Sequence, residues 1–221
     1  MFLFETRDLC KYYRDGSRSE VRALDEVTLG IERGSLTVVS GPSGSGKTTL
    51  LVLLGALERP TRGHVIFDGR DLADCSDVAL TRARRRMGFV FQDFALIPNL
   101  TAEENITYPL IPRGVPRSEQ RRRARAALTR LGMEDKLTVR ARRLSGGEQQ
   151  RVAIARALAG EPEVILADEP TSNLDAEASR TLLATFRDLH AEGRTVVLST
   201  HDPAAIGLAT RVYELRGGRL K

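Results

Sequence analysis

Short apolar runs alternate with longer helical patterns along most of the chain, which is typical of an α/β sheet. The runs 35–40 (SLTVVS), 164–167 (VILA) and 195–199 (TVVLS) are predicted to be buried parallel strands. Residues 88–91 (GFVF) are a fourth candidate strand. Each run precedes a loop and then a helical pattern, so the sequence predicts parallel strands joined by helices.

The pattern differs in two other parts of the chain. Alternation in VTLGIE, within the first 30 or so residues, predicts an antiparallel sheet at the N-terminal edge. Between about Thr101 and Leu144 no convincing strand occurs, and a Thr101-x-x-Glu104 capping box with an arginine-rich helix over 118–131 predicts a helical lobe. We therefore expect one domain, 1–221, with a core formed by 1–91 and 161–221 and an inserted helical subdomain over about 92–160.

Composition agrees with one folded domain and excludes several classes of protein. At 221 residues and 41% hydrophobic content, the chain can bury a sizeable core. Its two cysteines, Cys10 and Cys75, exclude a disulfide scaffold and a four-cysteine zinc site. No window approaches the ~20 apolar residues of a membrane helix. The N-terminus is too charged for a signal peptide, so we expect a soluble intracellular protein.

A phosphate-binding loop is the strongest local motif. Gly41-Pro-Ser-Gly-Ser-Gly46-Lys47-Thr48 fits G-x-x-x-x-G-K-[ST], follows a predicted strand and opens the apolar helix TTLLVLLGAL. Glycines let backbone N–H groups turn towards a phosphate, and the helix N-terminus adds positive potential. Lys47 is expected to reach the β- and γ-phosphates, and the Thr48 hydroxyl to bind Mg²⁺. The predicted nucleotide-binding residues here are Gly41, Pro42, Ser43, Gly44, Ser45, Gly46, Lys47, Thr48 and Thr49.

An acidic pair supplies the second half of this chemistry. The apolar strand from Val164 ends in Asp168, whose carboxylate is expected beside Mg²⁺. The adjacent Glu169 can polarise an attacking water, because carboxylates are suited to general-base work. Such a pair after a strand is usually a loop start, but beside a complete phosphate loop it indicates function.

A third motif separates this chain from other nucleotide enzymes. Leu144-Ser-Gly-Gly-Glu148-Gln-Gln-Arg151 resembles the signature motif of ATP-binding cassette (ABC) ATPases. The family's other elements occur in the family's order: Tyr13 resembles the adenine-stacking aromatic, Gln92 in FVFQDF the Q-loop, Asp175 in SNLD the D-loop, and His201 in STHD the switch histidine. The resemblance covers essentially the whole chain. It implies a P-loop NTPase core with a parallel sheet, an N-terminal antiparallel β edge and an inserted α-helical subdomain.

The resemblance also implies roles for these residues. Catalysis would fall to Glu169, His201 and Lys47, and Mg²⁺ would be held by Thr48, Gln92 and Asp168. His201 would contact the γ-phosphate, although a lone strand-end histidine is usually ordinary. Gln92 is either a metal ligand and sensor or a solvated loop amide. Tyr13 competes with Tyr12, and the family pattern L-x-K-x-Y favours Tyr13. Asp175 is both a good N-cap and a cross-dimer contact.

The signature has physics of its own. Ser145-x-x-Glu148 is a capping box that heads a predicted helix over 146–159, which makes a second helix N-terminus with flanking glycines. One nucleotide cannot easily engage both N-termini in one monomer. The family resemblance implies a head-to-tail homodimer, in which the signature (Ser145, Gly146, Gly147, Glu148) closes on the ATP and Mg²⁺ held by the other subunit.

The resemblance implies a membrane partner as well. The chain has no room for a membrane domain, so a separate permease subunit is expected, with this chain at the cytoplasmic face of the inner membrane. In related proteins the segment 93–106 (DFALIPNLTAEENI) contacts that partner, and here it either exposes Phe94, Leu96, Ile97 and Leu100 or packs them internally.

Several stretches look like the lipoprotein-releasing and macrolide-exporter group, which includes the cell-division ATPase. These stretches are 16–24 (GSRSEVRAL), 89–106, 142–158 and 166–175. Ser172 stands where that group usually has Gly, and Arg142 or Arg143 where it commonly has Pro. Export or release of a lipoprotein, peptide or hydrophobic compound is the predicted function. The alternative is the ATPase of a non-transporting cell-division or signalling complex.

Positive charge raises a third interpretation, a nucleic-acid ATPase. The chain carries 34 Lys and Arg against 29 Asp and Glu, a net +5 with a pI near 9.6. The long coiled coil, zinc cysteines or second cassette of nucleic-acid relatives do not occur, so no nucleic-acid partner is expected. Between Arg82 and Arg143 there are 15 basic and 6 acidic residues, so the whole excess lies there. This lobe is either a solvated arginine-rich face or a face turned to an anionic bilayer and the membrane subunit.

Overall fold

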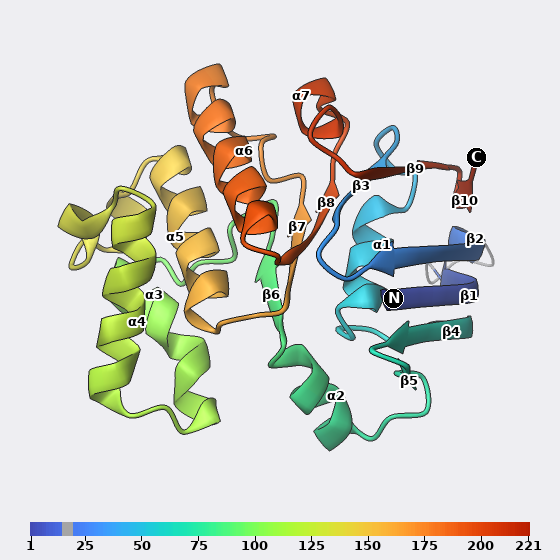
Figure 1. Cartoon of the computed structure of the whole chain (residues 1–221), viewed down its shortest axis with the longest axis horizontal. Coiled ribbons are helices and arrows are strands. Elements are labelled where there is room, and N and C mark those ends of the chain that lie inside the picture. Colours follow the sequence, from blue (N-terminus) through green and yellow to red (C-terminus); the bar gives the residue numbers. More distant parts are fainter. Residues whose placement is uncertain (15–19) are drawn as a thin grey trace.

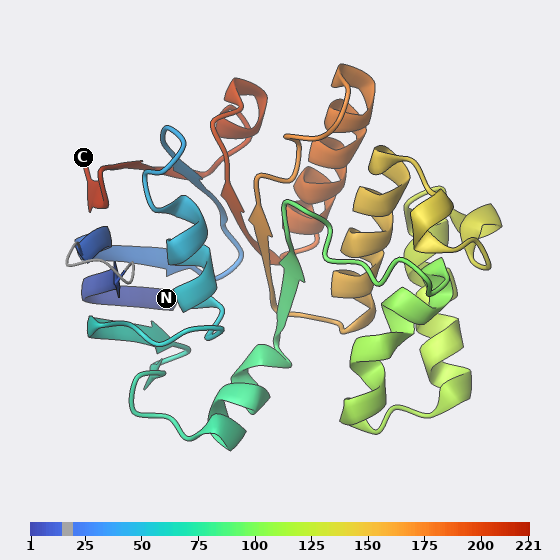
Figure 2. The ribbon, with the colours of Figure 1, turned by 180° about the vertical axis from the view of Figure 1, so that it is seen from behind.

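The computed structural model describes residues 1–14 and 20–221, so part of the GSRSEVRAL stretch lies outside the described residues. The chain forms two sheets with helices around them (Figures 1 and 2). The larger sheet has the strand order β10-β9-β3-β8-β7-β6, and the smaller has β2-β1-β4-β5. The strands are β1 Phe2–Arg14, β2 Glu20–Glu32, β3 Leu36–Ser40, β4 Arg62–Phe67, β5 Arg70–Asp71, β6 Met87–Val90, β7 Val164–Asp168, β8 Thr195–Ser199, β9 Arg211–Arg216 and β10 Arg219–Leu220.

Five strands of the larger sheet are parallel, and the four that the sequence predicts are among them. β3 pairs with β8, β8 with β7 and β7 with β6, all in parallel. Every residue of β7 and β8 is buried, because helices cover both faces of the sheet. β9, which sequence analysis missed, pairs in parallel with β3 on the other side, and β10 turns back against β9. Parallel pairing brings the carboxyl ends of these strands to one edge.

The N-terminal antiparallel sheet is confirmed and is larger than predicted. β1 pairs with both β2 and β4, with several register shifts, and β4 pairs with β5. Helix α1 (Lys47–Leu54) lies between the two sheets (Figure 1). Its Leu50 and Leu53 are buried in one apolar cluster with Val27 of β2 and Val197 of β8. Packing against both sheets therefore holds α1 in place, and with it the loop that directly precedes the helix.

Between β6 and β7 all the named elements are helical. They are α3 Ala102–Thr107, η1 Tyr108–Arg113, α4 Arg117–Arg130, η2 Glu134–Lys136, η3 Ala141–Arg143 and α5 Gly146–Ala159. The capping box of Thr101 and Glu104 is present at the start of α3. One apolar cluster joins Ile106, Leu128 and Val152 of these helices to Ile165 of β7. The predicted limits of the helical subdomain stay a prediction.

The remaining helices are α2 Asp77–Arg84, α6 Ala176–Ala191 and α7 Pro203–Ile206. The predicted apolar face of α6 is buried at Leu182, Leu183, Phe186 and Leu189, whereas Ala178 is only partly buried. No helix in the described ranges 1–14 and 20–221 has the length and apolar content needed to cross a membrane.

Carboxylates offset much of the arginine charge on α4. Arg121 pairs with Glu103, Arg122 with Glu119, Arg123 with Glu119 and Glu161, Arg125 with Glu134, and Arg130 with Glu192. Two arginines hold the pKa of Glu119 down to about 2. These contacts favour a solvated, internally paired arginine face over a free basic surface on α4.

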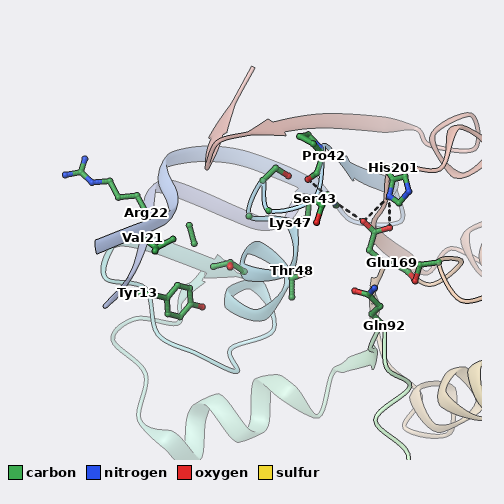
Figure 3. Close-up of a pocket in the computed structure, with 16 residues that line it drawn as sticks. Tyr13, Val21, Arg22, Pro42, Ser43, Lys47, Thr48, Gln92, Glu169 and His201 are labelled. Carbon is green, nitrogen blue, oxygen red and sulfur yellow. Dashed lines mark hydrogen bonds and ion pairs between the residues drawn. The ribbon is translucent and has the colours of Figure 1, made fainter. Parts of the chain in front are cut away.

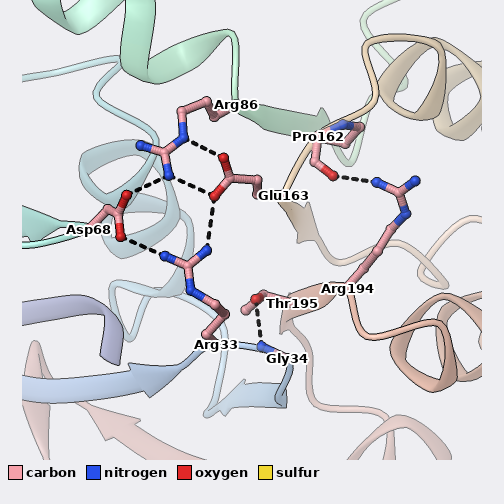
Figure 4. A network of polar contacts seen from close by, with 8 residues as sticks. All are labelled: Arg33, Gly34, Asp68, Arg86, Pro162, Glu163, Arg194 and Thr195. Carbon is pink, nitrogen blue, oxygen red and sulfur yellow. Dashed lines mark hydrogen bonds and ion pairs between the residues drawn. The ribbon is translucent and has the colours of Figure 1, made fainter. Parts of the chain in front are cut away.

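Four charged residues tie the two sheets together at the end opposite the carboxyl edge (Figure 4). Arg33, before β3, lies 2.6 Å from the Asp68 carboxylate and 3.0 Å from that of Glu163. Arg86, before β6, contacts the same two carboxylates at 2.6 and 2.7 Å. Hydrogen bonds from Arg86 lower the pKa of both carboxyl groups. The network links turns of the antiparallel sheet to the starts of β6 and β7, and so fixes the far ends of the strands that carry the site.

Candidate active site

A cavity of about 620 Å³ lies at the carboxyl edge of the parallel sheet (Figure 3). Loops after β3, β6, β7 and β8 contribute to it, and β1 and β2 close one side. This edge is where open α/β sheets bind ligands. The cavity is lined by Tyr13, Val21, Arg22, Ala23, Pro42, Ser43, Gly44, Ser45, Gly46, Lys47, Thr48, Thr49, Gln92, Glu169, Ser172 and His201.

The loop 41–46 has a backbone that only glycine permits at two positions. Gly46 has φ +102°, and a Cβ there would lie 2.3 Å from the carbonyl oxygen of Ala23. A Cβ on Gly41 would lie 2.1 Å from the carbonyl oxygen of Leu215. The loop is thus pressed against β2 and β9, and α1 begins directly after it. No side chain caps α1, so its first N–H groups face the cavity as donors for an anion.

Two polar groups in the loop suit a phosphate ligand. The Ser45 hydroxyl is buried and has no hydrogen-bond partner among the described residues. The Lys47 side chain is only 6% exposed, and its ammonium donates to the carbonyl oxygens of Gly41 and Pro42 at 2.9 and 3.2 Å. A buried cation held across a loop of N–H donors is an arrangement that binds phosphate oxygens.

The acidic pair lies at the end of β7, opposite the loop. Asp168 is buried and accepts a hydrogen bond from the Ser199 hydroxyl. Glu169 has φ +42°, a left-handed conformation that costs a non-glycine residue about 1 to 3 kcal/mol. Its N–H donates to the Ser199 carbonyl oxygen at 2.9 Å, which fixes this turn. The neighbouring strand therefore holds the Asp168 carboxylate and the Glu169 backbone, and the Glu169 side chain lines the cavity.

The Glu169 carboxylate lies between two nitrogen groups. Its Oε1 is 3.0 Å from the Lys47 ammonium, and its Oε2 is 3.3 Å from Nδ1 of His201 (Figure 3). The Glu169 side chain is 12% exposed, whereas that of His201 is 72% exposed. A cation, a carboxylate and an imidazole thus meet at one point, and the imidazole is free to reach a ligand.

The two tyrosines face different surroundings, because successive residues on a strand alternate. Tyr13 lines the cavity and donates to the Glu58 carboxylate at 3.0 Å. Burial, followed by that hydrogen bond, raises its pKa. Tyr12 donates to Asp25 at 2.9 Å, and contacts with Cys10 and Asp25 raise its pKa to about 12. The structure therefore brings Tyr13, and not Tyr12, to the cavity.

The other predicted residues divide into three groups. Gln92 is exposed at the cavity, and its carbonyl oxygen accepts from the Asn173 amide at 3.0 Å. Thr48 and Asp168 both line a smaller hollow next to the main cavity. Asp175 caps α6 by accepting from two backbone N–H groups, so its capping prediction is confirmed.

The signature lies outside this cavity. Ser145 and Glu148 form the predicted capping box at the start of α5, with 2.8 Å between the Ser145 N–H and the Glu148 carboxylate. A Cβ on Gly147 would lie 3.7 Å from Ala178 at the start of α6. Within one chain the start of α5 therefore packs beside α6 and not beside the phosphate loop.

Two groups of residues that contribute to the site are not predicted from the sequence. Val21, Arg22 and Ala23 line the cavity because β2 pairs with β1, placing Val21 opposite Tyr13. Ser199 lies at the end of β8, two residues before His201, where its hydroxyl donates to the Asp168 carboxylate and accepts the Glu169 N–H. Val21, Arg22 and Ala23 could have been identified if the register between β1 and β2 had been known. Ser199 could have been identified if β8 had been known to lie beside β7, because Ser199 then pairs with Asp168.

A phosphate loop beside an acidic pair occurs in several families of nucleotide enzymes, and similarity to known proteins shows which family this chain belongs to. Residues 24–172, more than half of the chain, match the family model described as ABC transporter. This chain belongs to the ABC transporter ATPase family. The phosphate loop, the acidic pair and the signature all lie within the matched range, and the fold class predicted from the sequence is confirmed by solved ABC cassettes.

Proteins similar in sequence or structure match this ABC ATPase over almost its entire length. An uncharacterized ABC transporter ATP-binding protein of Thermotoga maritima is 45% identical over 99% of this chain and 94% of its own length. A macrolide export ATP-binding/permease protein, MacB of Hyphomonas neptunium, is 44% identical over 99% of this chain, which spans only 34% of that relative. The solved structure of a dimeric post-hydrolysis state of the ATP-binding cassette MJ0796, bound to ADP and Pi, has a TM-score of 0.93 and 39% identity, covering 99% of this chain and 96% of that one.

Proposed function

We propose that this chain is the ATP-hydrolysing subunit that powers a separate membrane permease, exporting or releasing a lipoprotein, a peptide or a hydrophobic compound. The observation that carries the catalytic part is the meeting of Lys47, Glu169 and His201 at the N-terminus of α1. The transport part is supported by similarity to the macrolide export ATP-binding/permease protein MacB of Hyphomonas neptunium.

Nucleotide binding would use the loop and one face of the antiparallel sheet. The N–H groups of the loop and the unpartnered Ser45 hydroxyl are placed to donate to the phosphates of ATP. The adenine would lie on Tyr13, whose ring borders the same cavity and whose hydroxyl Glu58 holds in place. Base–aromatic stacking of this kind contributes about 1 to 3 kcal/mol.

The residues present fit a magnesium ion. Thr48 and Asp168 border one small hollow, and Gln92 lies at the rim of the main cavity, so one hydroxyl, one carboxylate and one amide oxygen are available. Oxygen ligands of this kind are those that Mg²⁺ prefers. When bound, the ion would neutralise charge on the β- and γ-phosphate oxygens. Ser199 would orient the Asp168 carboxylate for this task.

Hydrolysis would then follow from the chain's own groups. The Lys47 ammonium would exchange the Glu169 carboxylate for phosphate oxygens, which frees that carboxylate to accept a proton from the attacking water. Water oxygen would bond to the γ-phosphorus as the bond to the ADP oxygen breaks. His201, largely exposed beside Glu169, is placed to donate to the γ-phosphate and hold it in line.

A head-to-tail dimer would complete the site. The signature is a capped helix N-terminus, but it lies outside its own chain's cavity. A second copy related by a two-fold axis would place its Ser145, Gly146 and Gly147 against the γ-phosphate, with Asp175 beside the same interface. The dimeric state of the solved MJ0796 cassette supports this arrangement.

The adjacent tyrosines allow a matched test of nucleotide binding. Tyr13→Ala should raise the KM for ATP about 5- to 150-fold, because the stacking surface is lost, while kcat changes little. Tyr12→Ala, on the opposite face of β1, is the control and should leave KM within about twofold. Steady-state ATPase assays measure both. Equal effects of the two substitutions would contradict stacking by Tyr13.

A second groove, of about 370 Å³, is the proposed docking surface for the permease. Leu57, Ile97 and Tyr108 lie along it and are 40 to 57% exposed. Ile97 belongs to the segment 93–106 that sequence analysis assigned to the membrane partner. Phe94, Leu96 and Leu100 of that segment are partly buried, and of these Leu96 packs against the apolar cluster of the helices.

The chemistry of the groove indicates the kind of permease segment it would accept. Arg84, Arg113 and Arg156 also line it, and among the described residues they contact backbone carbonyl oxygens and the Thr81 hydroxyl but no carboxylate. Burial lowers the pKa of Arg113 and of Arg156, and for Arg156 the nearby Asp93 carboxylate offsets part of this shift. An amphipathic cytoplasmic segment with an acidic side chain would complement this apolar and basic groove. Such docking would place the chain peripherally at the cytoplasmic face of the inner membrane.

Co-purification tests the permease part of the proposal. Tyr108→Asp should reduce recovery of the integral membrane partner with the tagged chain at least about 10-fold, because it removes an apolar anchor and adds charge. The control is Val212→Asp, which alters another exposed apolar residue, on β9 and outside the groove. Quantitative mass spectrometry of detergent-solubilised membranes measures the partner. A membrane protein retained equally by both variants, or none recovered with the unmodified chain, would contradict docking in this groove.

A further inference from the structure

A lysine contacts the carboxylate that caps the signature helix. Glu148 is the third helical residue of α5, and one of its oxygens accepts the Ser145 N–H at 2.8 Å. Its other oxygen lies 3.2 Å from the ammonium of Lys136, at the end of η2. Lys136 is one of only four lysines in a chain whose other basic residues are arginines. Both oxygens of Glu148 are therefore engaged, one by the cap and one by a cation from another element.

The negative charge of Glu148 disfavours the binding of a phosphate at the start of α5. The N–H groups of Gly146 and Gly147 have no acceptor among residues 1–14 and 20–221, so they form the positive end of α5. A negative charge within the first turn stabilises the helix but offsets that positive end. The backbone hydrogen bond from Ser145 lowers the pKa of Glu148, so the group is charged at neutral pH. A phosphate approaching Gly146 would meet this charge at close range.

The surrounding backbone places Lys136 to cancel that charge. The Lys136 N–H donates to the Met133 carbonyl oxygen at 3.0 Å, and its own carbonyl oxygen accepts from Val139 at 2.9 Å. The side chain is 34% exposed, and Asp135 is a weaker competitor at 3.5 Å. Hydrogen bonding to Glu148 raises the pKa of Lys136, so the ammonium stays charged. The turn of η2 is thus fixed so that its lysine reaches the start of α5.

We propose that Lys136 is a positioning residue for the in-trans ATP site: it neutralises Glu148, so that the start of α5 can receive the γ-phosphate held by a second copy of the chain. This inference rests on the proposed function, because it requires the signature to meet ATP across a dimer. Glutamine can serve in a capping box as glutamate does. A chain with Glu148→Gln therefore keeps the cap but has no charge for Lys136 to neutralise.

A double-mutant cycle tests this role. Lys136→Ala should weaken each ATP contact about 2- to 5-fold, the usual range for a charge at a helix end. Because a two-fold dimer contains the pair twice, the dissociation constant of the ATP-bound dimer should rise about 4- to 25-fold. In the Glu148→Gln background the same substitution should change it less than twofold. Lys136→Arg should restore the unmodified value. Light scattering against protein concentration at saturating ATP measures dimerisation, and ATPase assays separate KM from kcat.

Controls distinguish this inference from the proposed function. Lys221→Ala removes a lysine paired with Glu214 at 3.0 Å and should have no effect. Gly146→Asp should abolish ATP-driven dimerisation if the signature acts in trans; retained dimerisation would overturn the trans site and the role of Lys136 together. With that control intact, an equal loss in both Glu148 backgrounds would show a merely structural role for Lys136. No loss in the unmodified background would overturn the inference as well.

Discussion

Replacing Glu169 with glutamine is expected to lower ATP turnover by about 10²- to 10⁴-fold, the range that general-base catalysis contributes. The amide has the same shape, and its oxygen can still accept from Lys47, which lies 3.0 Å from the carboxylate. What the amide cannot do is take up the proton of the attacking water. The γ-phosphate then stays in place, and the contacts that hold two subunits together persist.

Binding and turnover should therefore separate in this variant. Glu169→Gln should bind ATP with an affinity within a few-fold of the unmodified chain, and size-exclusion chromatography with ATP should show a persistent dimer. Glu192→Gln is the matched control, because Glu192 pairs with Arg130 at the surface, away from the cavity. Full turnover by Glu169→Gln would remove Glu169 from the role of base. Loss of ATP binding would instead assign it to the binding of nucleotide.

Burial explains which strands could be predicted from the sequence. β3, β6, β7 and β8 are buried at every position except Ser40 and Phe89, so each is a mainly apolar run that can be recognised without knowing its partner strand. The missed β9 has one buried and four exposed residues among its six, with two arginines. A strand this exposed, with only the two-residue β10 on its outer side, is recognisable only from its backbone pairing with β3.

The same distinction applies to the candidate site. Contiguous motifs, such as the phosphate loop and the capping box at Ser145, carry their geometry in local spacing. Contacts made by strand pairing do not, and so Val21 and Ser199 were missed. The ion pairs of α4 form a further case. Counting charges found an arginine excess, but the glutamates that offset it come from residues up to 62 positions away in sequence, as with Glu192 and Arg130.

The location of the signature leads to the second large effect. Lys47→Ala removes the cation of the phosphate loop, and Gly146→Asp adds a negative charge to the first turn of α5. Both chains should fold, because an acidic residue in a first helical turn is favourable and a Cβ on Gly146 has its closest neighbour at 3.6 Å. Each variant alone should lose at least about 100-fold in turnover, since every site across a symmetric dimer lacks one of its halves.

Mixing the two inactive chains should restore activity if each site is built from both subunits. In an equal mixture about half of the dimers are mixed, and each mixed dimer has one intact site of two, so turnover should recover to about a quarter of the unmodified value. The control mixes Lys47→Ala with a chain carrying both substitutions, where every phosphate loop that faces an intact signature lacks its lysine, so no recovery is expected. ATPase assays against mixing ratio measure the effect, which should peak at equal amounts. A Gly146→Asp chain that hydrolyses ATP by itself would contradict the composite site, because a cavity complete within one chain would have no need of the start of α5 that lies outside it.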